Sequence, residues 1–104
     1  MNQKDFDALL QDIIKDTTET LGLKGKEYGF GDRLHNFKTA AIHAKNTPEQ
    51  ALWGMAMKHL VSVEDLIEGR LENTRKNVRE KIGDLRNYLI LLEAVLEDTR
   101  ALTD

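Results

Sequence analysis

Apolar side chains recur every three to four residues along most of this chain, and this spacing constrains the fold more than any other feature. An α-helix turns once per 3.6 residues, so apolar positions at this spacing share one helix face. No segment shows the strict alternation of apolar and polar residues that is typical of a half-buried strand. The spacing therefore predicts an all-α fold. The clearest stripe near the start of the chain consists of Phe6, Leu9, Leu10, Ile13, Ile14, Thr17 and Leu21.

Four helices are predicted from this pattern, over about residues 3–21, 33–44, 48–68 and 74–98. A chain of 104 residues is near the commonest size of a single domain. Short linkers favour antiparallel packing of consecutive helices. The predicted architecture is therefore an antiparallel bundle of about four helices, forming one domain over residues 1–104.

The third helix has the clearest end signals. Thr47 is a typical N-cap, Pro48 suits the first helical position, and Gln50 can close a capping box. The helix is expected to run to about Glu68, with Gly69 as its stop.

The third helix is also apolar around most of its circumference. Trp53, Met57 and Val61 extend its apolar face well around the back. A helix of this kind is expected to be buried from several sides, at the centre of the bundle. The surplus apolar surface further predicts a homo-oligomer. The main apolar face consists of Leu52, Met55, Ala56, His59, Leu60, Val63, Leu66 and Ile67.

Composition argues against several classes of function. The net charge is −3, which gives no reason to expect direct nucleic-acid binding through a basic face. The absence of cysteine excludes disulfides and thiolate metal sites. No apolar run approaches membrane-spanning length, and the first ten residues lack the apolar core of a signal peptide. We therefore expect a cytoplasmic protein with no membrane partner.

The last helix carries two acids in an otherwise apolar setting. Glu80 and Asp84 lie four residues apart and so share a face. Asp84 falls at the edge of the predicted core stripe, beside Tyr88 and Leu91. A carboxylate in such a place is unfavourable unless a cation or hydrogen-bond donors compensate it. The predicted core stripe is Val78, Ile82, Leu85, Leu89, Leu92 and Leu96.

A second acidic pair, Asp65 and Glu68, lies at the end of the third helix. The short linker is expected to bring this end close to the start of the last helix, so that both pairs converge. Carboxylate oxygens suit Mg²⁺, with Mn²⁺ as a substitute. The predicted metal ligands are Asp65, Glu68, Glu80 and Asp84.

The structural alternative is that these acids are ordinary charges near the helix ends, neutralised by neighbouring cations. The candidate partners are Arg75 and Lys76 for Glu80, and Lys81 and Arg86 for Asp84.

A longer frame of the sequence resembles a known family. The segment "EKIGD" followed by an apolar helix resembles the second half of the ExxE…ExxD signature of MazG-like all-α nucleoside triphosphate pyrophosphohydrolases. The blocks "KGKEYG", "DRLHNFKTAA", "TPEQALWGMAMKHLVSVEDLI" and "EKIGDLRNYLILLEAVL" resemble the small phage and prophage proteins of a nucleotide-modification-associated domain family. The match covers roughly residues 24–96. The resemblance implies a MazG-like, oligomeric, nucleotide-handling protein whose acids hold Mg²⁺ at a triphosphate.

The sequence also departs from that signature. Lys81 stands where the signature has an acid three residues before the aspartate, and Glu80 lies on nearly the same face. Only Asp65 and Glu68 approximate the first half of the ExxE…ExxD signature. Glu80 and Asp84 are the predicted catalytic residues, while the altered acid set could mean a different nucleotide, a different reaction, or binding without catalysis.

The glycine-rich segment "GLKGKEYGFGD" holds four of the seven glycines, which are expected to break the helix and let backbone approach a ligand. Its cations could neutralise phosphates, and aromatic rings such as Tyr28 and Phe37 could stack on a base. The alternative is that these lysines are surface charges and these rings are core plugs. The predicted substrate-binding residues are Lys24, Lys26, Glu27, Tyr28, Asp32, Arg33, Asn36, Lys58 and Asn87.

The histidines do not indicate a metal centre of their own. His59 lies on an apolar helix face and is expected to be a core residue, while His35 and His43 lack a partner at zinc-ligand spacing. Two function classes stay open. One is a Mg²⁺-dependent hydrolase that releases pyrophosphate from free (deoxy)nucleoside triphosphates; the other is a non-catalytic nucleotide-binding or protein-interaction module of phage or prophage origin.

Overall fold

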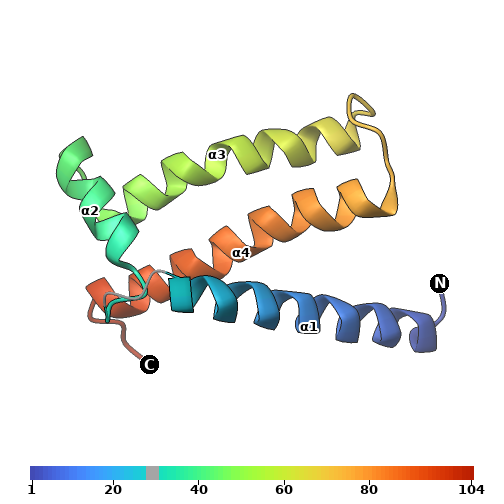
Figure 1. The fold of residues 1–104 in the computed structure, drawn as a ribbon, viewed down its shortest axis with the longest axis horizontal. Helices are drawn as coiled ribbons and strands as arrows, with labels where there is room; N and C mark the ends of the chain where they lie inside the picture. Colours follow the sequence, from blue (N-terminus) through green and yellow to red (C-terminus); the bar gives the residue numbers. More distant parts are fainter. Residues whose placement is uncertain (28–30) are drawn as a thin grey trace. The chain divides into compact units, whose positions relative to one another are not determined.

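The structure is a computed structural model that describes the backbone of residues 1–27 and 31–104, and the side chains of residues 1–22 and 31–104. Its described residues form helices and no strand, which confirms the all-α prediction. The chain divides into two compact units, Met1–Arg33 and Leu34–Asp104, each described here by itself. A single domain over residues 1–104 stays a prediction. The helices are α1 (Gln3–Glu27), α2 (His35–Ala44), α3 (Pro48–Ile67) and α4 (Arg75–Thr99) (Figure 1).

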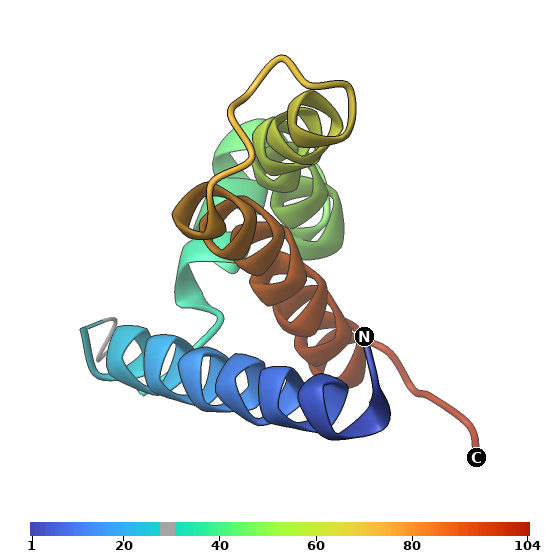
Figure 2. The ribbon, with the colours of Figure 1, turned by 90° about the vertical axis from the view of Figure 1, so that its right-hand side faces the viewer.

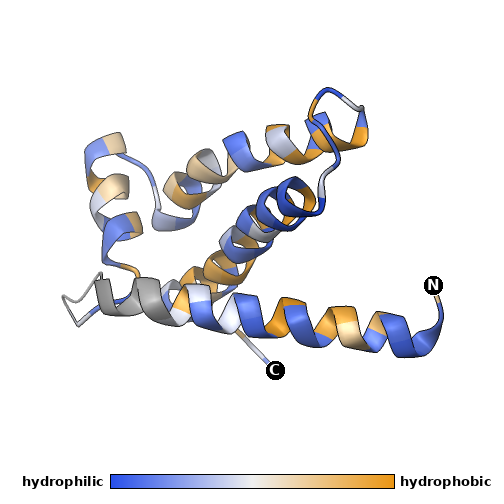
Figure 3. Ribbon diagram, turned by 45° about the vertical axis from the view of Figure 1, so that its right-hand side comes forward, coloured by the Kyte–Doolittle hydropathy of each residue, from blue (hydrophilic) through white to orange (hydrophobic). Residues whose placement is uncertain are grey.

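Helix α1 begins at a side-chain cap, where Asn2 Oδ1 accepts a hydrogen bond from the backbone N–H of Asp5 at 2.8 Å. The expectation that glycines end this helix near residue 21 is wrong, because α1 continues through Gly22 to Glu27. A glycine inside a helix costs only about 1 kcal/mol relative to alanine, and good helix formers surround it. Its apolar stripe is half exposed at Phe6 and Ile14, and Figure 3 shows the alternation of apolar and polar bands along the helix.

The predicted ends of α3 are confirmed. Thr47 Oγ1 accepts from the Gln50 N–H at 3.3 Å, and Gln50 Oε1 accepts from the Thr47 N–H at 3.0 Å, which completes the capping box. Pro48 occupies the first turn. The helix stops at Ile67, and Gly69 follows with φ of +76°, a conformation that favours glycine.

The core of the unit Leu34–Asp104 forms where α3 packs against both α2 and α4. Leu52 of α3 and Val95 of α4 are completely buried. Helix α3 is therefore the middle helix of this unit, but its burial is one-sided, since Trp53 and Val61 are about half exposed. The core cluster consists of Leu34, Phe37, Leu52 and Val95, with Met55, Tyr88, Leu91 and Leu92 packed against it.

The predicted core stripe of α4 is confirmed only in part, because Leu92 packs against the core but other members do not. Ile82 and Leu89 of that stripe are 44% and 48% exposed, whereas Tyr88, Leu91 and Val95 face the core. Helix α4 carries two apolar stripes about 100° apart, and only tertiary contacts decide which one is buried. Two aromatic contacts anchor the chosen stripe at Tyr88, whose ring lies 6.4 Å from that of Phe37 and 4.9 Å from that of His59.

The linker of residues 68–74 turns the chain back, so that α3 and α4 run antiparallel (Figures 1 and 2). Asn73 Nδ2 donates to the carbonyl of Leu66 at 3.2 Å. At its far end, Thr74 Oγ1 accepts from the Asn77 N–H at 3.0 Å and caps α4. The linker is thus fastened to both helices. Within the described residues, no helix combines the length and apolar character needed to cross a membrane.

Candidate acidic site on helix α4

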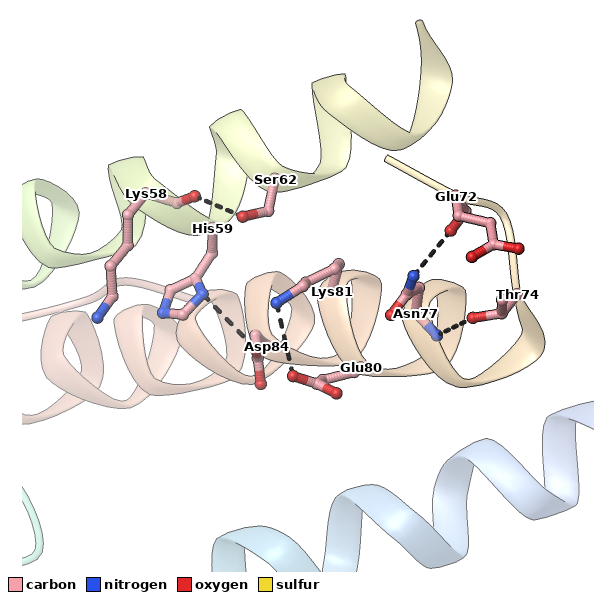
Figure 4. A network of polar contacts seen from close by, with 9 residues as sticks. All are labelled: Lys58, His59, Ser62, Glu72, Thr74, Asn77, Glu80, Lys81 and Asp84. Atoms are coloured by element: carbon pink, nitrogen blue, oxygen red, sulfur yellow. Dashed lines mark hydrogen bonds and ion pairs between the residues drawn. The ribbon is translucent and has the colours of Figure 1, made fainter. Parts of the chain in front are cut away.

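Asp84 projects from the core-facing side of α4 toward α3. Its Oδ2 lies 3.7 Å from Nδ1 of His59, which hangs from α3 (Figure 4). The two side chains are 38% and 17% exposed, respectively. The contact is an ion pair when the imidazole is protonated. A protonated His59 therefore compensates Asp84 across the helix interface, and the sequence predicts this histidine to be a core residue.

The His59 ring is itself held in place by an aromatic neighbour. It lies against the ring of Tyr88 at 4.9 Å with an interplanar angle of 33°. Tyr88 in turn contacts Phe37 of α2. The acidic side chain is thus supported by all three helices of the unit Leu34–Asp104, and its position is fixed by the core rather than by a loop.

Glu80 and Asn87 extend this site along α4. Glu80 lies one turn before Asp84, on the same side of the helix in Figure 4, and its Oε1 is 3.5 Å from Nζ of Lys81. Asn87 lies about one turn after Asp84, and its Oδ1 is buried without a hydrogen-bond partner in the described structure. An unpaired buried oxygen is unfavourable by about 1–3 kcal/mol, so this atom calls for a donor or a cation.

A cationic side chain faces the site from α3. Lys58 directs its ammonium group toward α4 beside His59 (Figure 4). The hydroxyl of Ser62, one turn further along α3, donates to the Lys58 carbonyl at 3.0 Å. Of the predicted substrate-binding residues, Lys58 is the neighbour of His59 on α3, and Asn87 lies on α4 about one turn after Asp84.

The second acidic pair has a different setting. Asp65 Oδ1 accepts from Nε of Arg70 at 2.7 Å, so its charge is neutralised by the linker. Glu68 is exposed at the end of α3. Within the described residues, no three histidine, aspartate or glutamate side chains gather into a group that could hold a metal ion. The four-carboxylate metal site therefore stays a prediction.

The remaining predicted residues fall elsewhere in the chain. Asp32 and Arg33 belong to the unit Met1–Arg33, and Asn36 is exposed on α2. Lys24, Lys26 and Glu27 lie in the last turns of α1, where the structure describes only the backbone, and Tyr28 lies outside the described residues.

The sequence left open whether the aromatic rings stack on a base or fill the core, and the structure answers this question for one of them. Phe37 is a core residue, 7% exposed, which agrees with the core-plug interpretation. Its neighbour Lys38 forms an ion pair with Asp98 at 2.7 Å and so ties α2 to α4.

The residue that sequence reasoning missed is His59 as the partner of Asp84. Both residues lie on the inward sides of helices joined by a short linker, and this signal was present in the sequence. The sequence does not reveal the register between the two helices, which decides that residue 59 meets residue 84.

The chain matches no family model, and comparisons of it with curated proteins and with solved structures likewise find no match. The resemblance to MazG-like proteins therefore remains an expectation from the sequence blocks alone.

Proposed function

We propose that the protein is a Mg²⁺-dependent nucleotide hydrolase that releases pyrophosphate from free (deoxy)nucleoside triphosphates. The observation that supports this best is the unpaired, buried Oδ1 of Asn87, which lies on α4 about one turn after the partly exposed Asp84. Glu80, Asp84 and Asn87 fall at successive turns of one helix, and all three offer oxygen, the ligand type that Mg²⁺ prefers. The donor set therefore fits a hard divalent cation.

The neighbouring residues would divide the remaining tasks. Glu80 and Asp84 would hold the metal, and His59 would keep the Asp84 carboxylate in position from α3. Lys58 would neutralise phosphate oxygens of the nucleotide. A carboxylate that is not bound to the metal would accept the proton of the attacking water. Bound Mg²⁺ would supply charge neutralisation at the phosphates and a lowered pKa of its water ligand.

The Asp65–Arg70 contact bears on the wider ligand set. Asp65 and Glu68 would join the metal only if Arg70 gave up its 2.7 Å contact with Asp65. An exposed pair of this kind is worth about 0–1 kcal/mol, so its loss is a small obstacle.

The test is a titration of Mg²⁺ and of Mn²⁺, with a mixed deoxynucleoside triphosphate pool, into wild type and Asp84→Asn. Calorimetry, melting temperature and pyrophosphate release are the readouts. A ligand at a hundred times its Kd stabilises by about 2.7 kcal/mol, and Asp84→Asn should lose this gain. Glu64→Gln, which removes an exposed acid from α3, is the matched control and should keep it. A wild type that ignores metal and nucleotide together would rule out the hydrolase.

A specific observation also favours a second candidate, a non-catalytic helical module of phage or prophage origin that binds nucleotide or a protein partner. Trp53, Val61, Ile82 and Leu89 leave apolar surface exposed on α3 and α4. Such surface usually marks an interface. A response to nucleotide without pyrophosphate release would favour the nucleotide-binding form of this candidate, and no response at all would favour the form that binds a protein partner. For both candidates we further predict a homo-oligomeric state, a cytoplasmic location and no direct nucleic-acid binding.

A further inference from the structure

Beside the core-facing residues of α4 lies a second apolar stripe with a regular spacing. Its residues are separated alternately by four and three positions, the heptad spacing of helices that pack side by side over their whole length. Ile82 and Leu89 in this stripe are 44% and 48% exposed. The other four residues of the stripe are partly buried, and Leu92 also packs against the core. An unbroken apolar stripe at heptad spacing still differs from scattered exposed residues, because it offers one continuous face to a partner. We call this stripe the α4 seam: Val78, Ile82, Leu85, Leu89, Leu92 and Leu96.

We propose that a second copy of this chain packs against the α4 seam, with the two α4 helices antiparallel about a twofold axis between Leu85 and Leu89. The symmetry makes one surface complementary to itself. It aligns Leu85 with Leu89 of the second copy, and Ile82 with Leu92 of the second copy. This proposal goes beyond the hydrolase and does not depend on it.

Charge beside the seam selects the antiparallel arrangement. On the outer side of the seam, Arg79 and Arg86 lie in the first half of α4, and Glu93 and Glu97 lie in the second half. Antiparallel pairing places Arg79 beside Glu93 of the second copy, twice by symmetry. Parallel pairing would place the basic half of one α4 beside the basic half of the other α4. Like charges in register oppose association, so the parallel form is disfavoured.

The apolar residues and the charges have separate roles. An exposed ion pair is worth about 0–1 kcal/mol, so two such pairs set the direction of the helices rather than the affinity. Affinity comes from burying Ile82, Leu89 and their neighbours, since burial of apolar surface drives most association. Arg79 and Arg86 also have contacts within the chain, and the pairing requires only that their charge lies beside the seam.

The first test places a charge inside the seam. Leu89→Glu should raise the Kd of the dimer at least about 100-fold, measured by sedimentation equilibrium, because it buries an unpaired carboxylate. Ile90→Glu is the matched control. Ile90 is the next residue of the same helix, is 38% exposed, and lies about 100° away from Leu89 around the axis. It should leave the Kd within about threefold, with helix content checked by circular dichroism.

The second test exchanges the charges. Arg79→Glu and Glu93→Arg should each weaken the dimer by about three- to tenfold, and the double variant should recover wild-type affinity. The two positions lie about 21 Å apart along one helix, so they cannot rescue each other within a chain. These side chains lie outside the core, and the test therefore holds even if Leu89→Glu fails to fold.

Each contrary outcome is informative. A wild type that stays monomeric at about 100 µM would show that another segment of the chain or a different protein covers the seam, and would overturn the proposal. A dimer that survives Leu89→Glu would place the interface elsewhere. A double charge variant no tighter than either single variant would overturn the antiparallel arrangement.

Discussion

Helix α1 and the α3–α4 pair have the same kind of sequence pattern and different fates. Each was predicted from apolar residues at helical spacing, and each forms a long helix. In α1, Phe6 and Ile14 are 49% exposed, whereas Leu52 and Val95 in α3 and α4 are completely buried. Spacing therefore fixes which residues share a helix face, but a packed partner decides whether that face leaves water. An isolated helix in water is marginal in stability for the same reason.

The largest effect should come from truncating the buried face. Leu52→Ala should lower the free energy of unfolding by about 2–5 kcal/mol, because it leaves a cavity in the core. Leu10→Ala in α1 should cost less than about 1 kcal/mol, since Leu10 is 40% exposed. Urea denaturation measures both. A cost at Leu10 as large as at Leu52 would mean that α1 is buried against a partner.

The N-caps of the two regions allow a matched comparison. Thr74→Ala removes the acceptor of the 3.0 Å hydrogen bond at the start of α4, and Asn2→Ala removes that of the 2.8 Å bond at the start of α1. Each should cost about 1 kcal/mol of helix stability. At Thr74 the loss should appear in global unfolding. At Asn2 it should appear in faster amide exchange of α1, and an unchanged exchange rate would contradict the role of this cap.

Substitution of two helical glycines should stabilise the helices, whereas the substitutions above destabilise them. A Cβ added at Gly54 of α3 or at Gly22 of α1 would meet no atom within 4 Å. Alanine should therefore stabilise each helix by about 0.5–1 kcal/mol. We expect Gly54→Ala to raise the melting temperature and Gly22→Ala to raise the protection of α1 amides. A Gly54→Ala variant that melts earlier would show that its surface is covered.

The smallest effect concerns pH. The Thr47 hydroxyl, the charge of Arg100 and a hydrogen bond from Thr99 hold the pKa of Glu49 below its ordinary value of 4.5, against the effect of burial. A lowered pKa contributes stability that is present above pH 4.5 and lost as the pH falls through the pKa of the folded state. Glu49→Gln should therefore flatten the fall in melting temperature below pH 4.5. An unchanged pH profile would show that the contact is energetically neutral.

Local signals in the sequence were reliable guides to the fold. The capping box at Thr47 and Gln50 and the stop at Gly69 were predicted because such signals depend only on residues within one turn. The extension of α1 through Gly22 was not predicted, because the cost of a helical glycine is small enough for its neighbours to overcome.

The candidate site was predictable only in part, for a tertiary reason. Asp84 was singled out because a carboxylate beside an apolar stripe needs compensation. Its partner depends on the register of α3 against α4, which no local pattern encodes. The core stripe of α4 was predicted only in part for a related reason: two stripes of similar apolar character compete, and contacts of Tyr88 with Phe37 and His59 decide between them.

The linker between α3 and α4 has a consequence for how the chain folds. It closes only a few residues, so bringing the two helices together sacrifices little chain entropy. Asn73 and Thr74 secure it at the ends of the two helices. Contacts between segments so near in the chain are typical of proteins that fold in microseconds to milliseconds. We expect the α3–α4 hairpin to be well formed in the folding transition state, with α2 joining it as Phe37 closes over Tyr88.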